Sequence, residues 1–203
     1  MPFFFQQTQF NKTVASLDGL PEYDMPEIAF VGRSNSGKSS AINTLTNQKQ
    51  LAYMSKMPGR TQNLNFFDVI RSKETVGFLV DLPGYGYAKT NKQISKSWDG
   101  FLGEYLLTRG QLKGMVLVMD SRRPVTDLDE TMLIWFSQVH KPIYILLTKI
   151  DKLNRSEQAQ ALRICKEKID KLNLSNKNIE IQLFSSSKKI GADVLSAKLQ
   201  TWL

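Results

Sequence analysis

Cysteine is almost absent from this chain, which has Cys165 alone among its 203 residues. A single thiol cannot form a disulfide within the chain, and this fits a reducing compartment. No apolar run is long enough to span a bilayer. The first ten residues hold three consecutive phenylalanines but neither a basic segment nor a long apolar core, so we expect no signal peptide. Repeats and low-complexity tracts are also lacking, and these absences together predict a cytoplasmic globular protein.

The charge balance is strongly basic, although the rest of the composition is ordinary for a globular domain. Hydrophobic residues make up 41% and charged residues 23%, and 203 residues suffice for one domain with a proper core. The formal net charge is +8, which suggests an acidic partner, and nucleic acid is the usual one. The basic residues are scattered, with only pairs such as Arg122-Arg123 and Lys188-Lys189, so a basic surface without a specific partner stays an alternative.

The stretch from Glu27 to Leu45 carries the most specific pattern in the chain. Residues 32–39, GRSNSGKS, fit the phosphate-binding pattern G-x-x-x-x-G-K-[ST]. An apolar run before it suits a buried strand, and the apolar spacing after it suits a helix. Strand, glycine-rich turn and helix N-terminus then come in the order that binds anionic oxygens. We therefore expect Lys38 to reach the β- and γ-phosphates and Ser39 to ligate Mg²⁺.

Strand-like and helix-like segments alternate along the rest of the chain. The expected strands are 28–31, 65–70, 76–80, 113–120, 143–147 and 179–184, and the expected helices are 40–45, 94–108, 127–139, 156–172 and 192–203. A hairpin turn at 71–74 makes one strand antiparallel. This predicts a three-layer α/β fold with a six-stranded, mostly parallel sheet and helices on both faces. Residues 25–203 would form this single domain, with residues 1–24 as an extension that packs on it.

Two further motifs stand where strands are expected to end, on the edge at which such sheets bind ligands. Asp81-Leu82-Pro83-Gly84 places a carboxylate for Mg²⁺ and an N–H near a γ-phosphate, although this pattern alone is common. Thr148-Lys149-Ile150-Asp151 selects the base, because its aspartate can accept two hydrogen bonds from guanine and adenine would leave it unpaired. A backbone N–H of Ser185-Ser186 could donate to guanine O6. These motifs predict a GTP site.

In this order the motifs resemble those of the translation-factor-related small GTPases, and the flanking residues resemble the EngB (YihA/YsxC) type of bacterial GTPase. The matching phrases are FVGRSNSGKSS, PGRTQNLNFF, VDLPGYGYA, LVMDSRRP, LLTKIDKL and FSSSKKIG. The resemblance covers nearly the whole chain. It implies a Ras-like G domain that hydrolyses GTP with Mg²⁺, a role in assembly of the large (50S) ribosomal subunit through rRNA and ribosomal proteins, and a link to septation and cell division.

The same resemblance implies the site residues of a monomeric GTPase. Lys38, Thr61 and Gly84 are the expected catalytic residues, and Ser39, Thr61 and Asp81 are the expected Mg²⁺ ligands. The expected nucleotide-binding residues are Gly32, Arg33, Ser34, Asn35, Ser36, Gly37, Lys38, Ser39, Ser40, Gly59, Arg60, Thr61, Gln62, Asn63, Asp81, Leu82, Pro83, Gly84, Thr148, Lys149, Ile150, Asp151, Phe184, Ser185 and Ser186.

Two residues bear on the rate of hydrolysis. Tyr85 stands where many small GTPases carry a glutamine that orients the attacking water, so slow intrinsic hydrolysis is expected. Asn35 matches the P-loop asparagine of potassium-activated relatives, and the equal alternative is that it only caps the turn. An activating partner or K⁺ would then raise the rate.

The sequence leads to three candidate functions. The first is a GTP hydrolase that assembles the large ribosomal subunit. The second is a GTP-gated module that recruits division or other proteins, without a direct ribosomal role. The third, an ATP-dependent kinase or ATPase, is disfavoured by the guanine-selecting motif at 148–151.

Overall fold

The structure, a computed structural model, describes residues 4–52, 63–85 and 100–203. Its strands are β1 (Gln9–Val14), β2 (Glu27–Gly32), β3 (Leu64–Arg71), β4 (Glu74–Asp81), β5 (Leu112–Asp120), β6 (Ile143–Thr148) and β7 (Ile179–Leu183). Its α-helices are α1 (Lys38–Leu45), α3 (Phe101–Thr108), α4 (Asp127–Ser137), α5 (Arg155–Lys171) and α6 (Ala192–Gln200), and short 3-10 helices lie at Leu17–Gly19 and Ile150–Lys152. No helix within these ranges is long and apolar enough to cross a membrane.

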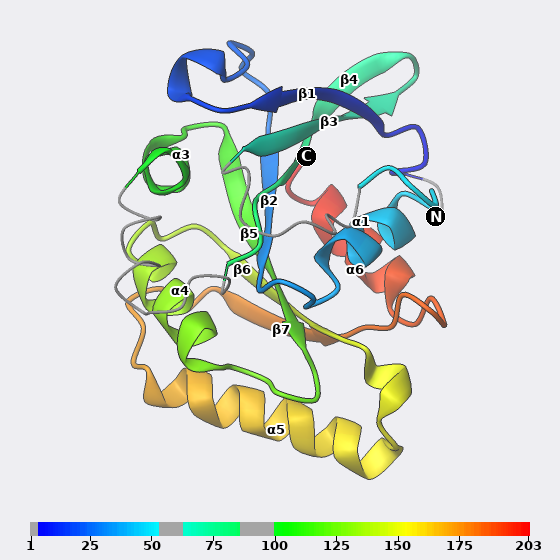
Figure 1. Ribbon diagram of the computed structural model, residues 1–203, viewed down its shortest axis with the longest axis vertical. Coiled ribbons are helices and arrows are strands. Elements are labelled where there is room, and N and C mark those ends of the chain that lie inside the picture. The colour runs from blue at the N-terminus through cyan, green and yellow to red at the C-terminus, as the bar shows by residue number, and fades with distance from the viewer. Residues whose placement is uncertain (1–3, 53–62, 86–99) are drawn as a thin grey trace.

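The strands form one sheet in the order β1-β3-β4-β2-β5-β6-β7 (Figure 1). Only β3 runs against the others, because it pairs antiparallel with β1 and β4 while the remaining neighbours are parallel. The mostly parallel sheet with one antiparallel strand is thus as expected, with seven strands in place of six. The additional strand is β1 at the edge. Of its residues only Val14 is buried, so it lacks the apolar alternation that marks a strand in a sequence.

Helices cover both faces of the sheet, and the alternation of side chains along β2 shows how. Ala29 and Val31 belong to the core beneath α3, α4 and α5, whereas Ile28 and Phe30 belong to the core beneath α1 and α6. All four side chains are fully buried, which is why β2 has a continuous apolar sequence rather than an alternating one. The three layers are those predicted for an α/β domain (Figure 1).

Local signals in the sequence located most element ends to within a few residues, although the last helix, expected at 192–203, ends at Gln200 and the helix expected at 127–139 ends at Ser137. The predicted hairpin turn between β3 and β4 is present, with Ser72 and Lys73 at φ 50° and 71°, as a two-residue type I′ turn requires. The helix expected at 156–172 begins one residue earlier, because the N-cap of α5 is Asn154, whose side chain accepts from the Glu157 N–H at 3.0 Å. The Glu157 carboxylate accepts in return from the Asn154 N–H, which makes a reciprocal capping box.

A buried carboxylate ties the start of β2 to the segment before it. Glu27 is fully buried and accepts from the Tyr105 hydroxyl at 2.9 Å and from Arg109 Nη2 at 2.6 Å. The same Arg109 nitrogen donates to the carbonyl of Pro21 at 2.6 Å. One ion pair therefore holds the leading segment, α3 and the central strand together, at the end of the sheet opposite the predicted site.

The last residues of the chain cover that same end of the sheet. A Cβ on Gly114 of β5 would lie 2.7 Å from the ring of Trp202, and one on Gly77 of β4 would lie 2.6 Å from Leu203 Cδ2. Glycine is needed at both positions because these two side chains occupy the space where a Cβ would be.

Candidate functional site

The glycine-rich turn lies between the end of β2 at Gly32 and the start of α1 at Lys38. Gly37 caps α1 with φ +100°, a left-handed conformation that residues with a Cβ rarely adopt. Gly32 is required for a different reason, since a Cβ there would lie 2.6 Å from the Val118 carbonyl and 2.7 Å from Ser36 Oγ. The turn therefore packs directly on β5 and presents the N-terminus of α1, as the sequence predicted.

The turn and the strand-end carboxylate of β4 are joined by an ion pair. Lys38 Nζ pairs with Asp81 Oδ1, and their side chains are 10% and 9% exposed. Asp81 is the last residue of β4, and Lys38 is the first residue of α1. The predicted phosphate ligand and the predicted metal ligand are thus neighbours.

The loop after Asp81 lies along the outside of the turn. The Ser34 N–H donates to the Tyr85 carbonyl at 2.9 Å, and the Tyr85 N–H donates to the Gly32 carbonyl at 3.2 Å. A Cβ on Gly84 would lie 3.1 Å from Ser34 Oγ and 3.2 Å from Ser34 N. Gly84 is therefore held in close contact with the phosphate-binding turn, where its N–H was expected to act.

Tyr85 turns its side chain away from this turn and into the core. Its hydroxyl donates to Asp129 Oδ1 at 2.6 Å, and both residues are buried. Asp129 also accepts from the N–H and the hydroxyl of Thr126, which completes the capping box of α4. Burial and then the nearby Asp129 carboxylate raise the pKa of Tyr85 well above its usual value. The sequence showed that Tyr85 stands where many small GTPases have a water-orienting glutamine. It did not reveal that the Tyr85 hydroxyl would bond Asp129, which lies 44 positions further along the chain.

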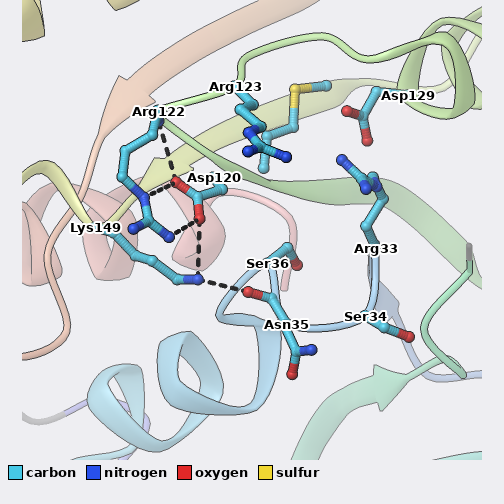
Figure 2. Close-up of a pocket in the computed structure, with 10 residues that line it drawn as sticks. Arg33, Ser34, Asn35, Ser36, Asp120, Arg122, Arg123, Asp129 and Lys149 are labelled. Carbon is cyan, nitrogen blue, oxygen red and sulfur yellow. Dashed lines mark hydrogen bonds and ion pairs between the residues drawn. The ribbon is translucent and has the colours of Figure 1, made fainter. Parts of the chain in front are cut away.

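The 148–151 motif begins at the last residue of β6 and contacts the phosphate-binding turn on the side away from the loop after β4. The buried Thr148 hydroxyl lies 2.5 Å from the Ser36 carbonyl and 2.9 Å from the Met119 carbonyl. Lys149 has a left-handed backbone, φ 61°, and its Nζ donates to the Asn35 carbonyl at 2.6 Å (Figure 2). The same ammonium lies 3.0 Å from Asp120 Oδ2. The motif predicted to recognise a base is therefore fixed to the phosphate-binding turn through two main-chain carbonyls, those of Asn35 and Ser36, and to β5 through a third, that of Met119.

Asp120 is a member of this cluster that sequence reasoning did not single out. It accepts from Lys149 and, through both of its oxygens, from Arg122 at 2.9 and 2.7 Å (Figure 2). Burial raises the pKa of Asp120, but the hydrogen bonds from Arg122 and Lys149 outweigh it and hold the pKa well below its usual range. Its position gave a signal, since Asp120 ends β5 as Asp81 ends β4.

Asp151, the predicted guanine ligand, is held by the loop after β7. The Ser185 hydroxyl donates to Asp151 Oδ1 at 2.6 Å, and this bond lowers the pKa of the Asp151 carboxyl. The Ser185 N–H already donates to the Ile190 carbonyl at 3.1 Å. Of the two N–H groups expected to face guanine O6, only that of Ser186 makes no hydrogen bond among the described residues.

The remaining predicted residues fall into two groups. Gly59, Arg60, Thr61 and Gln62 lie outside the described residues, whereas Asn63 immediately precedes β3. The Asn35 amide makes no hydrogen bond to the part of the chain that the structure describes, and the Asn35 backbone is left-handed, with φ 64°. Leu82 and Phe184 are buried beside the strand-end motifs. The other sequence-predicted positions lie in the turn and the first turn of α1, at the last residues of β2, β4 and β6, or in the loops after β4, β6 and β7.

These loops meet at the C-terminal edge of the sheet, and together they define a P-loop GTP-binding protein. A family model described as 50S ribosome-binding GTPase matches residues 27–149. Over its full length the chain is 49% identical to a probable GTP-binding protein EngB of Paraburkholderia phymatum, covering 93% of that protein. It is equally identical to the one of Burkholderia thailandensis, covering 94%. The chain belongs to the EngB family of GTP-binding proteins, and as such it is a P-loop GTP hydrolase.

Solved structures agree with the fold. A crystal structure of a probable GTP-binding protein EngB superposes with a TM-score of 0.61 at 22% identity, covering 86% of this chain and 97% of that one. Era in complex with MgGDPNP and nucleotides of 16S ribosomal RNA superposes with a TM-score of 0.60 at 21% identity, covering 88% and 57% respectively. At these identities the likeness concerns the fold alone.

Proposed function

We propose that this GTPase is a nucleotide-dependent switch that acts on the large (50S) ribosomal subunit during its assembly. The convergence of the 32–39, 81–84 and 148–151 loops on one edge of the sheet carries the nucleotide part of this proposal. The description of the matching family and the net charge of +8 support the ribosomal part. The acting unit would be a cytoplasmic monomer, with residues 25–203 as the GTP-binding domain and residues 1–24 as an extension packed on it.

In this proposal each loop has one task in binding the nucleotide. The N-terminus of α1 and Lys38 bind phosphate oxygens, and Lys38 exchanges its partner Asp81 for phosphate when nucleotide enters. Asp151, oriented by Ser185, accepts from guanine N1–H and its exocyclic amine. The Lys149 stem, whose ammonium is anchored on Asn35 and Asp120, lies along the base.

Mg²⁺ is the cofactor that the available donor groups fit. Asp81 and Ser39 offer a carboxylate and a hydroxyl beside the phosphate-binding turn, and hard cations prefer such oxygen ligands. No cluster of three or more acidic, histidine or cysteine residues occurs within the described ranges, so phosphate oxygens and water would have to complete the coordination. Thr61 is the third proposed ligand and lies outside those ranges. When bound, Mg²⁺ would neutralise charge on the β- and γ-phosphates.

Hydrolysis then depends on positioning and electrostatics supplied by this chain. Lys38 stabilises charge on the phosphoryl oxygens, and the N–H of Gly84 and the segment at Thr61 respond to the γ-phosphate. We propose a slow intrinsic rate, supported by the Tyr85 hydroxyl, which donates to Asp129 instead of to a water. An activating partner, or K⁺ bound near Asn35, would raise the rate. Turnover measured in K⁺ and in Na⁺ tests the cation, and equal rates would exclude it.

The base preference tests the nucleotide site. In Asp151→Asn the carboxylate acceptor is lost, so GTP affinity should fall at least about tenfold while affinity for xanthosine triphosphate rises, because xanthine carries a carbonyl in place of the amine. Asp170→Asn, a matched change on the exposed side of α5, should leave both affinities unchanged. An unchanged preference in Asp151→Asn would refute the proposed guanine contact.

The ribosomal role requires a separate experiment. The chain loaded with a non-hydrolysable GTP analogue should sediment with large-subunit particles, and the bound fraction should fall steeply as salt is raised, since phosphate contacts release counterions. Depletion should leave stalled large-subunit precursors. If neither occurs, the alternative of a GTP-gated module that recruits cell-division or septation proteins becomes the better account.

A further inference from the structure

A pocket of about 440 Å³ lies on the side of the phosphate-binding turn that faces the loop after β5 (Figure 2). Arg33 and Ser36 line it from the turn, Arg122 and Arg123 from the β5–α4 loop, and Asp129 from α4. Its volume falls in the lower part of the range, ~300–1,000 Å³, that is usual for ligand sites. The phosphate-binding turn and Lys149 bound it on one side, whereas the loop after β5 and α4, which carry none of the nucleotide motifs, bound it on the other.

The charges in this pocket do not balance within the described residues. Four basic and two acidic side chains line it. Asp120 is engaged by Arg122 and Lys149, and Asp129 by Tyr85 and Thr126. Neither Arg33 nor Arg123 makes an ion pair with any described residue. Two guanidinium groups therefore line the pocket without a matching anion, and Figure 2 shows both turned toward the same space.

The chemistry of these groups selects an oxyanion. A guanidinium is planar and weakly hydrated, and it pairs with phosphate through two N–H groups at once. The hydroxyl of Ser36 has no hydrogen-bond partner among the described residues, but it is buried against the backbone of the turn, 2.7 Å from where a Cβ on Gly32 would lie, so the two guanidinium groups are the donors open to a ligand.

We propose that this pocket binds a backbone phosphate of an RNA strand, an inference that rests on the proposed ribosomal function. A phosphodiester has two non-bridging oxygens that point in different directions, so Arg33 and Arg123 can each take one from opposite walls. The volume leaves room for the attached ribose, and the net charge of +8 favours a polyanion.

The walls of the pocket are also in contact with the loop after β4, which we propose responds to the nucleotide. Ser34, next to Arg33, hydrogen-bonds the Tyr85 main chain, and the Tyr85 hydroxyl contacts Asp129 on the pocket wall. A change in the loop after Gly84 therefore reaches the pocket within two contacts. RNA affinity should differ between the GTP-analogue and GDP forms of the full chain.

Arg123 allows a direct test because it is exposed and lies outside the nucleotide motifs. The probe is a short fluorescein-labelled oligoribonucleotide, and binding to the full chain loaded with a GTP analogue is measured by fluorescence anisotropy. Arg123→Ala should weaken binding about tenfold, the loss expected for one charge-assisted contact. Arg123→Lys, which keeps the charge but loses the fork, should weaken it about threefold. Arg163→Ala, on exposed α5, should change it less than about twofold.

The proposed phosphate site is tested by the effect of each substitution on RNA binding and by competition from other anions. Equal losses in Arg123→Ala and Arg163→Ala would overturn the proposal, and so would an acidic peptide that displaces the RNA better than a mononucleotide does. Displacement by a mononucleotide that weakens in Arg123→Ala supports phosphate as the recognised group. GTP affinity should be the same in all variants. Failure of the parent chain to sediment with large-subunit particles would refute the ribosomal function instead, independently of the comparison between variants.

Discussion

The hydrogen bond from Tyr85 to Asp129 predicts a specific loss of stability. In Tyr85→Phe the ring stays in place, but Asp129 Oδ1 loses a donor that lies 2.6 Å away in a buried environment. Hydrogen bonds to charged groups contribute about 1.5–3 kcal/mol. We expect the free energy of unfolding to fall by about that amount, measured by urea denaturation in the absence of nucleotide so that ligand binding does not contribute.

Tyr144→Phe provides a matched control. The Tyr144 hydroxyl donates to Gln182 Oε1 at 2.7 Å and is also buried, but its acceptor is neutral, so about 0.5–1.5 kcal/mol is expected. A double-mutant cycle of Tyr85→Phe with Asp129→Ala should give most of the difference as a coupling energy. If Tyr85→Phe costs no more than Tyr144→Phe, or if the cycle shows no coupling, the buried contact does not form in solution.

Three further predictions concern pH, the buried ion pair and the turn. The free energy of unfolding should fall as pH rises above about 10, because Tyr85 ionises in the unfolded chain while its raised pKa keeps it protonated in the folded protein. In Tyr85→Phe the free energy of unfolding, measured by urea titration at alkaline pH, should depend less steeply on pH. Arg109→Met leaves the Glu27 carboxylate buried without its cation and should cost about 3–5 kcal/mol, which adding Glu27→Gln partly restores if that pairing is the cause. Gly32→Ala should cost about 1–3 kcal/mol and weaken GTP binding, whereas Gly110→Ala, with open space around it, should do neither in the same assays.

The fold was largely predictable because its strong signals are local. Buried strands such as Ile143–Thr148 are continuous apolar runs, and the turn at residues 32–39 is a specific pattern in the right context. β1 was not predictable in this way, since most of its side chains are exposed and its strand character comes from pairing with β3. Edge pairing is a tertiary effect that leaves little trace in a short polar segment.

The site was predictable at the level of motifs and less so at the level of partners. Spacing identified Lys38, Asp81 and Asp151, but it could not show that Ser185 would use its hydroxyl to hold Asp151 while its N–H is taken elsewhere. Nor could it show that Asp120 would anchor the 148–151 motif. Such contacts join residues far apart in sequence and depend on the packed sheet, which local patterns do not encode.

The closure of the sheet by Trp202 and Leu203 has a consequence for how the protein is made. Those side chains fill the space left by Gly114 and Gly77, so the ends of β4 and β5 are complete only once residues 202 and 203 have left the translating ribosome. Until then a nascent chain exposes apolar surface over its middle strands, and such surface favours misassociation. A chaperone that captures stalled nascent chains should hold those arrested before residue 202 and release those that extend well past it.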